Sequence, residues 1–129
     1  MGEFLGECGV GISETLGAGE PAKVTAFEVW LFDKSDIRTI TKVLMSQYAY
    51  NDDALRTRLA PKGDHVLAEL GKDMVLETTS LRVDARVVDM EYDGEAMPPQ
   101  SQFTKLTVEL VARPIESGGE PEGMAGMIT

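Results

Sequence analysis

The chain has 129 residues and a formal net charge of −10, from 22 acidic and 12 basic side chains. A field of that sign repels nucleic-acid phosphates and anionic membrane surfaces, so nucleic acid is excluded as a direct partner. No apolar run approaches the ~20 residues that cross a bilayer, which argues against direct membrane insertion as well.

The same composition predicts one globular domain. Hydrophobic residues make up 43% of the chain, and its length is sufficient to bury a core without disulfides or a metal. The lone Cys8 has no partner for an intramolecular disulfide. The N-terminus lacks the basic and long apolar segments of a signal peptide, so we predict a cytoplasmic protein.

The first predicted element is a glycine-rich strand over residues 4–12. Gly9 and Gly11 begin a pattern like the dinucleotide-binding fingerprint, but Glu14 takes the place of its third glycine and no apolar strand precedes it. We therefore interpret the glycines as marks of a bulge or of a close backbone approach. The abrupt start predicts further sequence upstream, and residues 13–21 are predicted to be a loop.

Residues 24–33 are predicted to form the central strand, because they are rich in aromatic and β-branched side chains. Its two sides carry Phe27, Val29 and Leu31, and Val24, Ala26, Trp30 and Phe32, respectively. Only Glu28 interrupts this pattern, so both faces need a cover. One face should meet an opposing sheet, and the other a short helix, a missing N-terminal segment or another subunit.

Residues 37–46 allow two interpretations. Ile37, Ile40, Leu44 and Tyr48 recur at helical spacing, but the segment is rich in β-branched side chains. The preceding residues 33–36 form a turn short enough to close a hairpin with residues 24–33. The sequence therefore favours a strand that pairs antiparallel with the central strand.

One short helix is predicted after the two tyrosines of Tyr48-Ala-Tyr50. Asn51 or Asp52 is suited to cap it, and Leu55 and Leu59 give it an apolar stripe at i, i+4 spacing. Pro and Gly within residues 60–63 end it. We expect this helix to lie across an edge of the sheet.

Short strands fill the rest of the chain. They are predicted at residues 65–69, at 74–79 running with little break into 81–87, and at 103–112, with a long loop over 92–102. Alternation directs Leu81, Val83, Ala85 and Val87 inward, as well as Leu106, Val108 and Leu110. The predicted fold is mostly β, an antiparallel β-sandwich or small barrel with one short helix over residues 1–114, followed by a disordered tail over 115–129.

Candidate catalytic and metal-binding residues are sparse. The only histidine, His65, would need Cys8 or a serine and an aspartate to complete a hydrolase triad, and no nucleophile elbow surrounds either kind of nucleophile. One cysteine and one histidine cannot form a four-ligand zinc site. Three acidic loops offer weak Ca²⁺ candidates without EF-hand spacing, namely Asp33, Asp36, Asp52, Asp53 and Asp93. We predict no cofactor.

Aromatic residues give the best candidates for an interaction surface. Tyr48, Tyr50 and the single Trp30 offer large contact areas at little cost in side-chain entropy. We therefore predict a non-enzymatic structural or protein-interaction domain that binds a protein partner or associates with itself. Such a domain could be a fragment of a larger protein. A Ca²⁺-dependent binding module and a small hydrolase that uses His65 are the alternatives.

Overall fold

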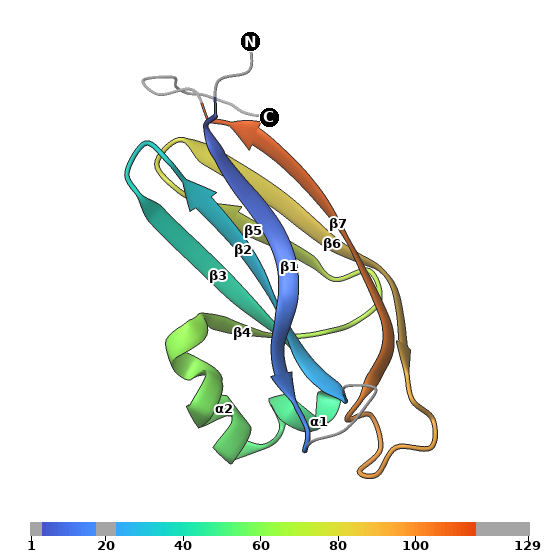
Figure 1. Ribbon diagram of the computed structural model, residues 1–129. Helices are drawn as coiled ribbons and strands as arrows, with labels where there is room; N and C mark the ends of the chain where they lie inside the picture. Colours follow the sequence, from blue (N-terminus) through green and yellow to red (C-terminus); the bar gives the residue numbers. More distant parts are fainter. Residues whose placement is uncertain (1–3, 18–22, 116–129) are drawn as a thin grey trace.

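Two β-sheets packed face to face make up the protein. A computed structural model describes residues 4–17 and 23–115 (Figure 1). The first sheet has the strand order β1 (Gly6–Thr15), β2 (Val24–Asp33), β3 (Arg38–Met45) and β4 (Asp64–Leu67). The second has the order β5 (Asp73–Glu77), β6 (Leu81–Tyr92) and β7 (Phe103–Pro114). The predicted mostly-β sandwich is confirmed.

Helical segments connect β3 to β4. They are α1 (Gln47–Tyr50), α2 (Asp53–Leu59) and a 3₁₀ turn at Ala60–Lys62. The predicted cap is confirmed for Asp52, whose side chain accepts a hydrogen bond from Leu55 N at 3.0 Å. The sequence did not predict the single turn of α1, which Ser46 begins by accepting a hydrogen bond from Ala49 N.

Strand pairing is antiparallel except between β3 and β4. Residues 38–45 form a strand, as favoured, and they pair antiparallel with β2, with Lys42 opposite Val29. The pairing of β3 with β4 is parallel, which the expectation of an antiparallel sheet did not include. The helical connection explains it, because parallel neighbours need a crossover much longer than a hairpin turn.

Several boundaries differ from the prediction. The first strand continues to Thr15 through residues predicted to be loop, and β6 continues beyond residue 87 to Tyr92, the first residue of the predicted 92–102 loop. The run over 74–87 is broken by a tight turn, closed by a hydrogen bond from Thr78 N to Leu81 O of 2.9 Å. Of the predicted tail, Ile115 donates its backbone N–H to Ser80 O, and residues 116–129 lie outside the described residues.

The main core lies between the two sheets. Val29 and Leu31 of β2 and Leu44 of β3 are buried there against β5 and β6. The inward residues of β6 are all buried, and those of β7 are half-buried against the same core, as the alternation predicted. The core members are Val29, Leu31, Leu44, Ala68, Met74, Leu76, Leu81, Val83, Ala85, Val87 and Phe103.

A second apolar cluster covers the other face of β2. Ala26 packs there with residues of β3 and with the helices, and its buried members are Ala26, Val43, Met45, Ala49, Leu55 and Leu59. Further along the same face, Trp30 lies against β1 at Gly9, where a Cβ atom would come within 2.7 Å of its ring. The chain itself therefore covers part of the second face of β2. The helix packs beside Ala26, and Gly9 leaves space for the indole of Trp30.

Candidate interaction surface

The open side of the sandwich, between β1 and β7, is the strongest candidate for a functional surface. Both strands are at the edge of their sheet, and they have 10 and 12 residues. The edge strands on the opposite side, β4 and β5, have only 4 and 5 residues. Long unpaired edges expose backbone N–H and C=O groups that can pair with another strand. Figure 1 shows β1 and β7 along this side of the molecule.

Apolar side chains that belong to the interior are uncovered on this side. Val10 lies opposite the buried Val29 and Ile12 opposite Phe27, so both side chains are on the inward face of the first sheet. They are nevertheless 40% and 56% exposed. The first sheet has four strands and the second has three, and no strand beyond β7 lies opposite this part of β1 among the described residues. The inner face of β1 is therefore incompletely covered.

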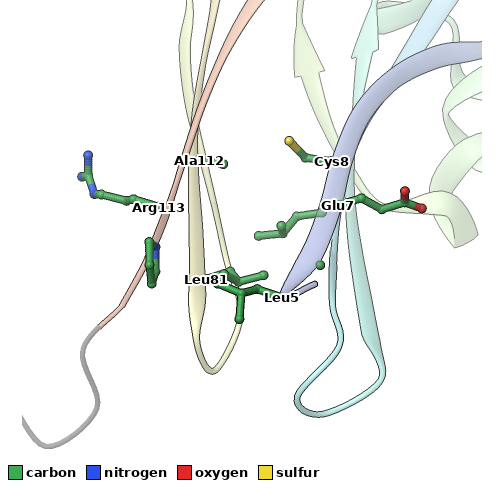
Figure 2. A pocket seen from close by; sticks show the side chains of 9 residues that line it. Leu5, Glu7, Cys8, Leu81, Ala112 and Arg113 are labelled. Atoms are coloured by element: carbon green, nitrogen blue, oxygen red, sulfur yellow. The ribbon is translucent and has the colours of Figure 1, made fainter. Parts of the chain in front are cut away.

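An apolar pocket of about 220 Å³ lies at the end of the open side where β1 meets the end of β7. In Figure 2, Cys8 and Ala112 face the gap from opposite sheets, and Leu5 and Leu81 lie close together at one end of it. The charged side chains Glu7 and Arg113 point away from the gap. The lining of the pocket is therefore mostly apolar, and its charged neighbours are turned outward.

Strand β7 is the more regular of the two open edges. Strand β1 has register shifts after Ile12 and again after Glu14, and such irregularities hinder the pairing of an edge. In β7, proline occurs only at the last residue, Pro114. Register shifts in the β6–β7 pair leave Val88 of β6 and Thr104 of β7 without a partner, so β7 has one irregularity, close to its start. From residue 105 to residue 113 the edge of β7 is free of such interruptions.

The outer face of the second sheet carries several charge pairs beside the exposed Val75 and Val111. Arg82 contacts Glu77 at 3.1 Å and Asp84 at 3.0 Å, and Arg113 contacts Asp84 at 3.3 Å. Lys105 contacts Asp89 at 2.6 Å. The Lys105 ammonium lowers the pKa of Asp89, and the same contact raises the pKa of Lys105. These charge pairs separate the exposed apolar side chains of this face and favour its contact with water.

The predicted aromatic candidates lie elsewhere and do not form one surface. Tyr48 and Tyr50 project from α1 and pack against the second apolar cluster, whereas Trp30 lies beside Gly9 and is not part of that packing. The charge of the Asp52 carboxylate, and then its hydrogen bond, raises the pKa of Tyr48. Tyr50 is covered by the Arg56 guanidinium, 4.8 Å from its ring centroid. All three are half-buried, and their role in binding stays a prediction.

The acidic Ca²⁺ candidates have structural roles in turns and caps. Asp36 accepts a hydrogen bond from Thr79 at 2.8 Å, and Asp93 accepts one from Glu95 N at 2.9 Å. Asp52 caps α2, and Asp53 lies in the first turn of that helix. No group of three or more histidine, cysteine or acidic residues in the described chain is placed to hold a metal ion.

Asp33 is fully buried and ties the two sheets together. Its carboxylate accepts hydrogen bonds from Ser35 N at 2.8 Å, Thr78 Oγ1 at 2.7 Å and Ser80 N at 2.9 Å. Burial raises the pKa of Asp33, but the hydrogen bonds from Thr78, Ser35 and Ser80 together outweigh it and hold the pKa well below its usual range. The carboxylate therefore joins the β2–β3 turn to the β5–β6 turn and has little capacity left for a metal ion.

His65 and Cys8 are at opposite edges of the first sheet, so the structure does not bring them together as a catalytic pair. His65 lines a polar pocket of about 470 Å³ with Lys42, Tyr50 and Lys72. Its Nε2 atom is buried and has no hydrogen-bond partner in the described part of the chain. The carboxylate contact expected of a catalytic histidine is not seen there, and the hydrolase alternative stays an untested prediction.

Comparisons with known proteins do not assign the chain to a family. No protein-family model, curated protein or solved structure matched it. Within the described residues, none of the helices has the length and apolar character needed to span a bilayer. The open side of the sandwich is therefore the feature that best indicates a function.

Proposed function

We propose that this protein is a non-enzymatic protein-interaction domain that binds a β-strand along its open side. The observation that supports this most is the exposure of Val10 and Ile12, which face the interior of the sandwich but have no strand opposite them. Side chains of this kind are covered in a closed sandwich. An added strand next to β7 would cover them and pair the unpaired edge at once.

Two further features support this proposal. The apolar pocket at Cys8 and Ala112 lies in the same gap and offers a depression for a side chain of the added strand. The remaining described edges, β4 and β5, are short, which is one of the ways in which sandwich proteins limit unwanted pairing. Only the β1–β7 side combines long free edges with uncovered interior side chains.

Site-specific photocrosslinking in the cells that express the protein tests the proposal. A photoreactive amino acid replaces Ile12 in one variant and Leu70 in a control, because Leu70 is also exposed, at 68%, but lies in the turn between β4 and β5. We expect a discrete crosslinked protein for position 12 and none for position 70. The absence of any crosslink at position 12, in a variant that folds, would contradict the proposal.

A polar substitution provides a second test. Ile12→Asp should abolish the crosslinks formed from a photoreactive group at Val10. The introduced carboxylate would lie between β1 and the added strand and would have to be desolvated when that strand binds. The matched control is Val75→Asp, since Val75 is 41% exposed but lies on the outer face of β5. Both variants should keep the wild-type thermal midpoint within a few degrees, because their side chains are already exposed.

A further inference from the structure

We infer that the strand added to β7 is β7 of a second copy of this chain, and this inference rests on the proposed function. The two strands would run antiparallel about a two-fold axis perpendicular to the second sheet, at Thr107. A two-fold axis in this orientation keeps the inner faces of both sheets on one side, so the three-stranded sheets would join into one continuous sheet. The inner face of the joined sheet would cover β1.

Charge supports a second copy at this edge. The chain as a whole carries −10, so two copies repel each other over most of their surface. Strand β7 carries charges of both signs, namely Lys105, Glu109 and Arg113, and its two basic side chains also contact Asp89 and Asp84 of β6. The β7 edge is therefore a place where two copies of this acidic chain can approach closely.

The register at Thr107 is complementary in both charge and apolar character. Pairing about Thr107 places Lys105 opposite Glu109 of the second copy, and by symmetry it does so twice. It also places Leu106 opposite Val108, so apolar side chains meet on the inner face. All four lie on β7, where Lys105 and Glu109 are exposed and Leu106 and Val108 are half-buried. Opposite charges directly across an antiparallel pair stabilise it, and like charges destabilise it.

Alternative registers are less favourable. A two-fold axis at Glu109 would place Glu109 against itself and Lys105 against Arg113, so every charged pair would repel. An axis at Val111 would again pair Glu109 with a basic residue, Arg113, but the paired stretch would run to Pro114, which has no backbone N–H to donate. The axis at Thr107 pairs residues 105–109, which lie in the regular part of β7 and include no proline.

Charge reversal on β7 tests the inference. The variants are Lys105→Glu and Glu109→Lys, each measured alone by sedimentation velocity over a range of concentrations and then in a 1:1 mixture. The wild-type chain should dimerise, and each variant alone should bind itself on the order of tenfold more weakly, because two attractive pairs become repulsive. The mixture should dimerise like the wild type, since each mixed dimer regains both opposite-charge pairs.

The mixture controls for damage to folding, because two misfolded variants would not rescue each other. A wild-type chain that is monomeric at all concentrations would overturn the inference, as would a dimer that neither variant weakens. A chain without residues 116–129 that dimerises when the full chain does not would show that the C-terminal segment occupies the edge, and this result would also contradict the inference.

The crosslink at position 12 separates this inference from the proposed function. A species of twice the mass of one chain, composed only of this protein, supports the second copy. A crosslink to a different protein would overturn the second copy and leave the strand-binding function in place. The loss of both the crosslink and the dimer would contradict both.

Discussion

Removal of the Leu59 side chain tests whether α2 covers the second face of the central strand. Leu59 is fully buried, and it packs in the cluster that includes Ala26, Val43 and Met45. Leu59→Ala removes three carbon atoms. At about 0.8 kcal/mol for each buried methylene, their transfer to water costs about 2.4 kcal/mol. The cavity that remains brings the expected loss of unfolding free energy to about 2–5 kcal/mol.

Urea denaturation followed by fluorescence measures this loss. Trp30 is the only tryptophan, and it lies on the same face of β2 as the cluster, so its emission reports on this part of the fold. The denaturation midpoint should fall while the slope m stays constant. A domain of this size has a stability of about 5–15 kcal/mol, so the variant should still fold in water.

Leu70→Ala is the matched control, because the same atoms are removed from a side chain that is 68% exposed. It should change the unfolding free energy by less than about 0.5 kcal/mol. If Leu59→Ala destabilised the protein no more than Leu70→Ala, α2 would not be docked on the sheet in solution. The second face of β2 would then need another cover, and the assignment of the open side as the principal uncovered surface would be wrong.

Three other predictions follow from the packing and the turns. Asp33→Asn should lower the stability of the protein more than Asp36→Asn at neutral pH. Because the folded pKa of Asp33 lies below its unfolded value of about 3.9, its contribution is present above that pH and is lost as the pH falls below it. Wild-type stability should therefore fall more steeply than that of Asp33→Asn in acid denaturation series, and equal slopes would refute this role. Gly9→Ala should cost about 1–3 kcal/mol through its clash with Trp30, whereas Gly11→Ala, whose Cβ atom meets no neighbour, should be neutral or slightly stabilising, as measured by thermal unfolding. Millimolar Ca²⁺ should leave the thermal midpoint unchanged, and a large upward shift would revive the Ca²⁺-dependent alternative.

Local patterns in the sequence were sufficient for most of the strands. Alternation in residues 81–87 depends only on which side of one strand faces the core, and the structure buries the predicted side chains. In residues 37–46 the β-branched side chains were a better guide than the helical spacing. The strand that they form pairs with β2 in a hairpin and buries Leu44 in the main core. These features need no knowledge of distant neighbours.

The main errors in topology involve residues far apart in the sequence. The turn after β5 was missed because part of what fixes it is Asp33, 45 residues before Thr78, whose carboxylate accepts hydrogen bonds from Thr78 and Ser80. The parallel β3–β4 pair was missed because it depends on where the helical crossover leaves the chain. Strand order likewise decides which apolar residues are covered, so the exposure of Val10 and Ile12 was not predictable from their spacing.

Strand order also explains why the candidate surface in the structure differs from the one around Trp30 that the sequence suggested. The sequence identified the correct problem, a strand with two apolar faces, and offered three covers for the second face. The helix and Gly9 cover part of that face within the chain, and Trp30 stays half-buried there. The uncovered apolar area instead lies at the edge, because a four-stranded sheet faces a three-stranded one. A second copy that adds its own β7 would balance the two sheets, and it would make association a consequence of unequal strand number rather than of an exposed aromatic residue.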